Sequence, residues 1–321
     1  MIGKILGTGS AVPVRRVTND ELSTMVETND EWIRSRTGIG CSHIISGEES
    51  TVSLSIDAAK NALDMAKVRP EEIDAILVAT ISSNVILPCT ACEVQNALGC
   101  VNAFCYDLSA ACSGFVFAYN TAQAYIQTGM IRTALVIGAD CLTSLTNFED
   151  RSSCILFGDA AGAAVVQATE EDLPYGFAMH SDGGKGWAMT CKSRHQEKQP
   201  AWEETFMQMN GKEIFKFAST RVPQILHEIL EQKGLQPEEI DHYILHQANG
   251  RIIEAIARKM KLPLEKFPMN VEEYANSSSG TVPLLMDQMN RDGRLKKGDK
   301  VILCGYGAGV SWGAAYLEWP M

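Results

Sequence analysis

The segment Pro70-Glu-Glu-Ile-Asp-Ala-Ile-Leu-Val-Ala-Thr80 returns about half a chain length later as Pro237-Glu-Glu-Ile-Asp-His-Tyr-Ile-Leu-His-Gln247. Each copy follows a stretch with helical periodicity, at residues 53–67 and 214–233. In the second stretch the apolar residues recur at intervals of three and four, which is typical of one buried helix face. A helix followed by the same lead-in and an apolar strand therefore occurs twice in the chain.

Two further pairs of similar segments keep the same order along the chain. They are Gly162–Val166 with Gly313–Leu317, and Thr133–Gly138 with Asp299–Cys304. Three such pairs in one order predict an α/β protein of two duplicated halves, residues 1–170 and 171–321, in which strands alternate with helices. We expect mixed sheets covered by helices in a layered core.

The second copy of the repeat leads directly into a polar segment. The strand expected at Tyr243–Leu245 runs into His246-Gln-Ala-Asn249, and a helix is expected over residues 251–260. In open α/β sheets, ligands gather at the carboxyl ends of strands. His246 is therefore a candidate for the functional site.

Cys112 has a similar setting in the first half, within Ala103-Phe-Cys-Tyr-Asp-Leu-Ser-Ala-Ala-Cys-Ser-Gly-Phe-Val-Phe117. A strand is expected to end near Asp107, and a helix to begin at Ser113-Gly114 and continue to about Gln127. A thiol at a helix N-terminus lies near unpaired N–H groups and the positive end of the helix dipole. We therefore expect a nucleophile with its pKa lowered into the range of about 3.5–7.5.

Two more polar or flexible stretches stand beside strands or helices in the second half. Asn276 lies in a turn-prone run, Tyr274-Ala-Asn-Ser-Ser-Ser-Gly-Thr-Val-Pro283, ahead of a helix expected over residues 284–289. Gly305-Tyr-Gly-Ala-Gly309 is expected to form a turn between strands, where backbone can approach a substrate closely.

Composition sets the broad class of the protein. The 321 residues are 45% hydrophobic and 21% charged, as in ordinary soluble proteins, and the net charge of −11 argues against non-specific nucleic-acid binding. Ten cysteines show no disulfide framework, and Cys89-Thr-Ala-Cys92 is interpreted as two thiols on a helix rather than a metal site. The N-terminus is too glycine-rich for a signal peptide, and no run approaches the ~18 apolar residues of a membrane span. We expect a cytoplasmic protein that binds neither nucleic acid nor membrane.

Taken together, these stretches resemble the β-ketoacyl-[acyl-carrier-protein] synthase III family, which has the thiolase fold and starts bacterial fatty-acid synthesis. The resemblance covers the whole chain and keeps its order. The segments that carry it are Asp30–Gly38, Ala111-Cys-Ser-Gly114, Arg151–Asp159, His246-Gln-Ala-Asn249, Asn276 and the glycine turn. The set of Cys, His and Asn matches this branch, whereas elongating ketoacyl synthases use Cys, His and His.

The resemblance implies an acyltransferase that works in two steps. Cys112 would take the acyl group of an acetyl or short branched acyl-CoA primer, with the N–H groups of Cys112 and Gly307 forming an oxyanion hole. Malonyl-acyl-carrier protein would then bind, and His246 and Asn276 would stabilise the enolate left by decarboxylation. The carbanion would attack the acyl-cysteine in a Claisen condensation and give 3-oxoacyl-acyl-carrier protein. No cofactor is implied, because the CoA thioester is a substrate.

The resemblance also implies binding residues. The CoA residues would be Thr28, Trp32, Arg36, Arg151 and Asn249, with Trp32 and Arg151 on the two faces of the adenine. Lys216 and Arg251 would contact the acidic carrier protein. Leu87 would close the acyl pocket of the partner subunit in a homodimer.

The chain departs from the family pattern at three positions. Tyr306 stands where Phe is common, Ala308 where Gly is common, and Leu87 where acetyl-selective relatives often carry Phe. A condensing enzyme of specialised metabolism that uses a longer acyl-CoA therefore remains an alternative. A degradative thiolase with Cys304 as its second cysteine, a Cys–His hydrolase and a non-catalytic acyl-carrier-binding subunit are further alternatives.

Overall fold

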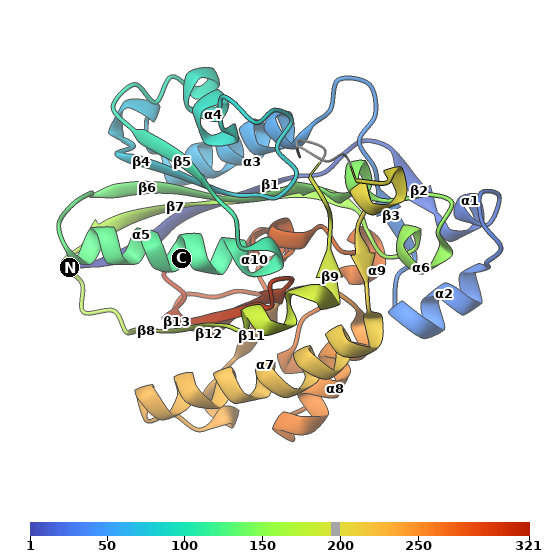
Figure 1. Ribbon diagram of the computed structural model, residues 1–321. Helices are drawn as coiled ribbons and strands as arrows, with labels where there is room; N and C mark the ends of the chain where they lie inside the picture. The colour runs from blue at the N-terminus through green and yellow to red at the C-terminus, as the bar shows by residue number, and fades with distance from the viewer. Residues whose placement is uncertain (194–199) are drawn as a thin grey trace.

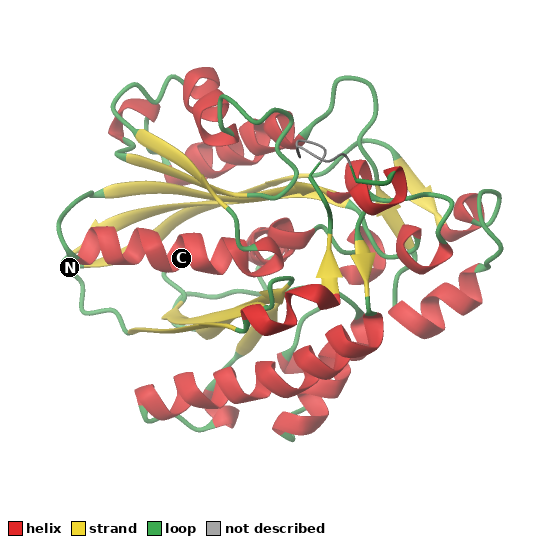
Figure 2. Ribbon diagram, in the orientation of Figure 1, coloured by secondary structure: helices red, strands yellow, loops and turns green. Residues whose placement is uncertain are grey.

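The computed structural model describes residues 1–193 and 200–321, and in it helices and sheets are stacked in layers (Figure 1). Two sheets lie roughly face to face. Helices α3 (Thr51–Ala66) and α4 (Thr90–Leu98) cover the outer face of one sheet, and α7 (Gly211–Lys233) and α8 (Gly250–Met260) that of the other. Helices α5 (Gly114–Gln127) and α10 (Thr281–Arg291) lie between the sheets. Figure 2 shows the same layers as alternating red and yellow.

The first sheet has five strands in the order β1-β7-β6-β4-β5. Their bounds are β1 (Ile2–Ala11), β4 (Ala75–Ala79), β5 (Phe104–Leu108), β6 (Thr133–Cys141) and β7 (Asp159–Thr169). Every residue of β4 and β6 is buried, because helices pack on both faces of the sheet. Strand β5 is the edge strand beside β4.

The second sheet has four strands in the order β11-β12-β13-β8. Their bounds are β8 (Tyr175–Ser181), β11 (His242–Leu245), β12 (Lys300–Gly307) and β13 (Ser311–Glu318). Strand β11 runs parallel to β12, and β12, β13 and β8 alternate in direction. The first sheet has the same pattern, since β4 runs parallel to β6, and β6, β7 and β1 alternate in direction. The repeated segments of the sequence thus occupy matching places in two similar sheets.

Shorter elements lie at the ends of these layers. Two small sheets pair β2 (Arg16–Thr18) with β3 (Cys41–His43) and β9 (Met189–Thr190) with β10 (Gln208–Met209). The remaining α-helices are α1 (Asn19–Leu22), α2 (Asp30–Thr37), α6 (Arg151–Cys154) and α9 (Val271–Tyr274). No helix within residues 1–193 and 200–321 is long and apolar enough to cross a bilayer.

The middle layer brings the two halves into close contact. A Cβ added at Gly138 of β6 would lie 2.3 Å from the carbonyl oxygen of Ser279, just ahead of α10. Only glycine allows this approach, because real Cβ contacts of that length do not occur. The segment that contains Asn276 is therefore packed directly against a strand of the first half.

Most of the predicted elements are confirmed within a few residues. Helix α5 begins at Gly114 and ends at Gln127, and α8 begins one residue earlier than predicted. Helix α10 begins at Thr281, three residues before the predicted start, and Gly305–Gly307 belong to β12 rather than to the turn.

Candidate active site

Cys112 lies between β5 and α5, in a short 3-10 turn at Ala111–Ser113. Its side chain is only 6% exposed. Ala111, immediately before it, has a φ of 45°, which residues with a Cβ rarely adopt. Such strain persists only where the surrounding structure holds it, and it clusters at functional sites.

The prediction of a lowered pKa for Cys112 is wrong for this resting site. Burial raises the pKa of the thiol to about 12, although the Ser278 hydroxyl and the N–H groups of Cys112 and Ala308 act in the opposite direction. The negative charge of Asp140 adds to the upward shift. Removal from water therefore outweighs the helix terminus, and the thiol is protonated at neutral pH.

His246 follows β11 directly and is 1% exposed. Its Nδ1 atom lies 2.7 Å from Thr281 Oγ1, and the ring of Tyr306 packs edge-on against it at 5.1 Å between centroids. The Tyr306 hydroxyl donates a hydrogen bond of 3.0 Å to the carbonyl oxygen of His246. Burial lowers the pKa of His246 to about 3, so the imidazole is neutral across the physiological range.

Asn276 is 7% exposed and joins the first half through backbone pairing with the Phe157 region. Its side-chain Oδ1 accepts the N–H of Ser278 at 2.9 Å, which fixes the orientation of the amide. Ala275 and Ser278, on either side, both have a φ of 51°. The Ser278 hydroxyl is buried and close enough to Cys112 to lower its pKa, yet it lacks a well-formed hydrogen bond.

The segment 276–281 connects these three residues. Ser278 interacts with Cys112 and donates its N–H to the Asn276 amide, and Thr281 contacts His246. Asp140, at the end of β6 and fully buried, anchors the segment by accepting the N–H of Ser279 at 3.2 Å and lying 2.8 Å from its hydroxyl. Sequence analysis missed Thr281, Ser278 and Asp140. The available signal for the first two was the hydroxyl-rich stretch Ser277-Ser-Ser-Gly-Thr281 at the start of an apolar helix.

The end of β12, in the second half of the chain, packs directly against Cys112. A Cβ added at Gly307 would lie 2.7 Å from the Cβ of Cys112 and 3.0 Å from its Sγ, so this position admits only glycine. The N–H group of this turn that acts on the sulfur belongs to Ala308, one residue beyond the Gly307 selected from the sequence.

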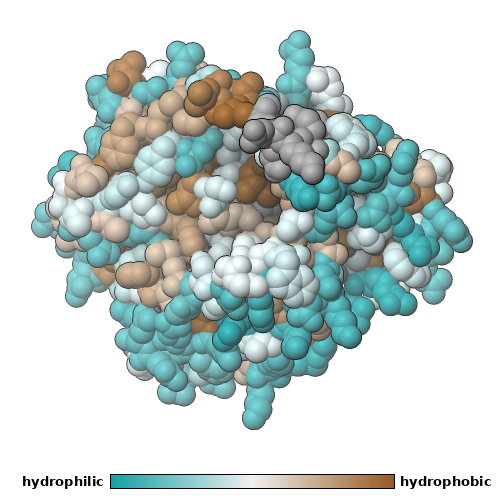
Figure 3. Space-filling model, viewed as in Figure 1, coloured by the Kyte–Doolittle hydropathy of each residue, from teal (hydrophilic) through white to brown (hydrophobic). Residues whose placement is uncertain are grey.

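A cavity of about 1290 Å³ reaches this site at Ala111 and Ala308. Part of its wall is apolar and comes from Ile81, Leu145, Met189 and Met207. Ser83–Ile86 form another part of the wall. Figure 3 shows apolar side chains gathered on this face of the molecule, near α4 and in the hollow between the two halves.

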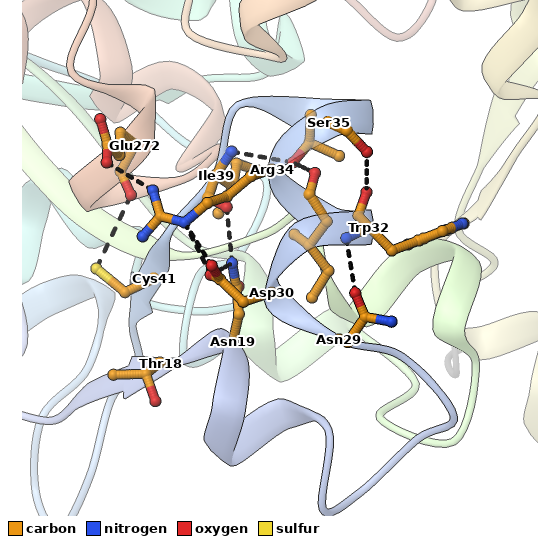
Figure 4. A network of polar contacts seen from close by, with 12 residues as sticks. Thr18, Asn19, Asn29, Asp30, Trp32, Arg34, Ser35, Ile39, Cys41 and Glu272 are labelled. Carbon is orange, nitrogen blue, oxygen red and sulfur yellow. Dashed lines mark hydrogen bonds and ion pairs between the residues drawn. The ribbon is translucent and has the colours of Figure 1, made fainter.

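Trp32, Arg36 and Arg151 lie together at the surface. The guanidinium carbon of Arg151 lies 5.0 Å from the centroid of the Trp32 ring, and that of Arg36 lies 5.7 Å from it. Helix α2, which carries Trp32, is capped by Asn29 and fixed by ion pairs of Arg34 with Asp30 and Glu272. In Figure 4 the Trp32 indole points away from these hydrogen bonds and ion pairs. They therefore fix helix α2 without contacting the indole ring.

Thr28 lies in the loop before α2, and Asn249 is the N-cap of α8. Thr28 Oγ1 is buried with no hydrogen-bond partner among the described residues. Asn249 caps α8 by accepting the N–H of Arg251, and its amide donates to the carbonyl of Arg36 at 3.3 Å. Asn249 therefore ties the Arg36 region to the helix that follows His246.

The remaining predicted residues lie at the surface or in the core. Lys216 and Arg251 are exposed on α7 and α8, and neither forms a salt bridge with another described residue. Leu87 is 84% exposed in the loop before α4. Cys304, the second cysteine of the thiolase alternative, is fully buried within β12 in the core of the second half.

Comparison with protein families gives two matches, one mainly in the first half of the chain and one in the second. Residues 106–183 match the model of 3-oxoacyl-[acyl-carrier-protein] synthase III, and residues 230–319 match its C-terminal model. The β-ketoacyl-[acyl-carrier-protein] synthase III of Clostridium acetobutylicum is 42% identical over 320 residues, which cover 98% of either chain.

Solved structures agree in fold and extent. The crystal structure of 3-oxoacyl-[acyl-carrier-protein] synthase III from Aquifex aeolicus matches with a TM-score of 0.94 and 37% identity, covering 99% of this chain and 100% of that one. A priming β-ketosynthase of a polyketide pathway matches with a TM-score of 0.93 and 32% identity, covering 99% and 96%. With its thiolase-like architecture of two similar halves and its full-length relatives, the chain belongs to the 3-oxoacyl-[acyl-carrier-protein] synthase III family of condensing acyltransferases.

Proposed function

We propose that this enzyme catalyses the decarboxylating condensation of an acyl-CoA primer with malonyl-acyl-carrier protein, and so initiates fatty-acid synthesis in the cytoplasm. The observation that supports this most directly is the segment 276–281, which links a buried cysteine of one half to a buried, neutral histidine of the other. We also propose that the two halves meet near residue 170, since the first sheet ends at Thr169 and the second begins at Tyr175.

In the first half-reaction Cys112 attacks the thioester carbonyl and releases CoA. The thiol is protonated at rest, so its proton leaves as the sulfur attacks, and the buried site contains a neutral imidazole to receive it. The N–H groups of Cys112 and Ala308 stabilise the oxyanion, because both already act on the sulfur. Gly307 has a steric role in this proposal, since its missing side chain lets β12 approach Cys112.

In the second half-reaction the malonyl thioester carbonyl lies between His246 and Asn276. The amide NH2 of Asn276 is free to donate, because its Oδ1 atom is held by the N–H of Ser278. A neutral His246 donates through Nε2–H when Nδ1 accepts from Thr281. Two donors stabilise the enolate formed on loss of CO2, and that carbanion attacks the acyl group on Cys112.

Substrates approach from the face that carries Trp32. We propose that the adenine of CoA stacks between Trp32 and Arg151 after the Arg151 guanidinium moves away from the ring that it contacts at 5.0 Å. Arg36 then binds phosphate, and Thr28 and Asn249 line the pantetheine channel. The carrier protein is acidic, and Lys216 on α7 and Arg251 in the first turn of α8, the helix that follows β11, offer exposed positive charge. In a homodimer, the exposed Leu87 reaches the acyl cavity of the partner subunit.

Mass spectrometry of the acylated protein tests the proposal. After incubation with acyl-CoA the acyl group should be on Cys112 alone, and Cys112→Ser should abolish it. Addition of malonyl-acyl-carrier protein should release a product two carbons longer than the primer. Hydrolysis of the acyl group without elongation would instead support the Cys–His hydrolase.

Two variants separate the half-reactions. His246→Ala and Asn276→Ala should each slow decarboxylation by on the order of 10²–10³, the scale of a lost oxyanion donor. Acylation of Cys112 should fall less in Asn276→Ala, because Asn276 is assigned to the enolate only. An Asn276→Ala enzyme that condenses at the normal rate would remove this residue from the site.

A further inference from the structure

Three cysteines outside the active site converge beside α4. Cys89 is the N-cap of the helix, Cys92 lies in its first turn, and Cys105 lies on the edge strand β5. The Sγ atoms of Cys89 and Cys92 are 3.4 Å apart, and those of Cys92 and Cys105 are 3.3 Å apart. All three are partly buried free thiols.

The surroundings hold these thiols in place. Asp107, two residues beyond Cys105, accepts the N–H groups of Thr90 and Ala91 at 2.9 and 2.8 Å and so fixes the first turn of α4 against β5. No group of three or more His, Cys, Asp or Glu side chains in residues 1–193 and 200–321 has an arrangement suited to a metal ion.

We propose that Cys89, Cys92 and Cys105 form a reversible dithiol–disulfide site in which Cys92 is the shared member. A small-molecule disulfide such as oxidised glutathione supplies the oxidising power. The thiolate of one cysteine attacks that disulfide, forms a mixed disulfide and releases one glutathione thiolate. The neighbouring protein thiolate then attacks the cysteine sulfur of the mixed disulfide and releases the second glutathione thiolate. The protein loses two thiol protons, which the two released glutathione thiolates take up.

Proximity is what favours the intramolecular disulfide. Burial raises the pKa of Cys89, and the hydrogen bond that the Cys92 thiol donates to Cys105 raises the pKa of Cys92, so neither is an activated nucleophile. However, a thiol already 3.3–3.4 Å from its partner needs to move by only about 1.3 Å to reach bonding distance. The high local concentration makes closure of the second bond faster than exchange with free glutathione.

The site is coupled to the wall of the acyl cavity. Ser83, which lines the cavity, lies 3.3 Å from Asp107 and 3.2 Å from the Thr90 hydroxyl. A disulfide that involves Cys92 alters the first turn of α4, and Ser83 is hydrogen-bonded to that turn. We therefore expect oxidation to change the shape of the cavity between Ser83 and Ile86, and with it the choice of primer.

Peptide mapping of the full-length protein tests the site without any assay of catalysis. The protein is incubated with oxidised glutathione, free thiols are blocked, and the chain is cut after glutamate, which separates Cys92 from Cys105 at Glu93. We expect two fewer free thiols than the ten of the reduced chain. The peptide ending at Glu93 should either be lighter by two hydrogens or be linked to the peptide that contains Cys105.

Matched variants identify the cysteines. Cys92→Ser should abolish both products, and Cys89→Ser should leave only the link to peptide 94–149. Cys105→Ser should remove that link, which separates Cys105 from the other cysteines of the same peptide, and Cys191→Ser should leave both products unchanged. A disulfide pattern unaffected by Cys92→Ser, or covalent dimers in place of the internal bond, would overturn the proposal. Primer ranking should change on oxidation, return on reduction and stay constant in Cys92→Ser. An unchanged ranking after complete oxidation would overturn the coupling to the cavity.

Discussion

The Thr281 hydroxyl has one proton and two acceptors within reach. It lies 2.7 Å from His246 Nδ1 and 3.0 Å from the carbonyl oxygen of Ser278, which also accepts the backbone N–H of Thr281. If the hydroxyl donates to Nδ1, the imidazole proton is on Nε2 and His246 is a donor. If it donates to Ser278, Nδ1 keeps the proton and Nε2 can accept one. A rotation of this hydroxyl would therefore let His246 accept a proton in acyl transfer and donate a hydrogen bond in condensation, the two roles that we propose for it.

Thr281→Val should test this role, because valine keeps the shape and removes the hydroxyl. We expect condensation to slow by about tenfold, the scale of one hydrogen bond of about 1.4 kcal/mol, with little change in KM for acyl-CoA. Thr281→Ser should restore the rate. Nitrogen NMR of His246 should show the loss of the mixed tautomer in Thr281→Val, and an unchanged spectrum would contradict the assignment.

The buried imidazole also predicts an effect of pH on stability. The pKa of His246 is about 3 in the folded protein and near 6.5 when exposed, so the unfolded chain binds the proton more readily between these values. The free energy of unfolding should therefore fall as the pH drops below about 6.5, by up to about 1.4 kcal/mol per pH unit from this residue.

The comparison of wild type with His246→Gln isolates this contribution. Asp159 acts in the opposite direction, because burial raises its pKa to about 6 and the folded state then binds its proton more readily. In urea titrations the free energy of unfolding of wild type, relative to that of His246→Gln, should decrease steadily as the pH falls from 7 to 4. His227→Gln, at an exposed position, should track the wild type.

At the scale of elements, strands and helices could be predicted because their signals are local. The repeated lead-in and strand placed His246 at the end of β11, and the run of small residues placed Cys112 at the start of α5. Thr281 contacts His246, and Asp140 accepts a hydrogen bond from the Ser279 hydroxyl. Each contact joins residues far apart in the chain, so no local sequence pattern predicts it. The raised pKa of Cys112 has the same origin, since it depends on what covers the thiol after folding.

Gly138→Ala tests the contact between β6 and the segment ahead of α10. The added methyl group would lie 2.3 Å from the Ser279 carbonyl oxygen, so one backbone must move. We expect the free energy of unfolding to fall by about 1–3 kcal/mol and condensation to be lost, as measured by denaturant titration and product formation. Gly211→Ala is the control, because its Cβ would meet only Met209 at 3.9 Å. Normal condensation in Gly138→Ala would show that the segment tolerates displacement.

At the scale of the whole molecule, Leu87 links primer choice to assembly. In our proposal the exposed Leu87 side chain packs against a second subunit. Leu87→Phe should narrow the primer range toward acetyl-CoA, by a graded factor, because one methylene is worth only ~1–3 kcal/mol of discrimination. Competition assays with acetyl, butyryl and branched primers measure this change in primer preference. An identical ranking in both proteins would show that Leu87 does not reach the pocket.

The contact between β12 and Cys112, which joins the two halves, has a consequence for the chain during its synthesis. Cys112 emerges from the ribosome within the first half, long before the Ala308 amide and His246 are synthesised. A nascent chain with a folded first half therefore has a thiol but neither the second oxyanion donor nor the imidazole. In our proposal such a chain therefore cannot turn over acyl-CoA until β12 packs against Cys112.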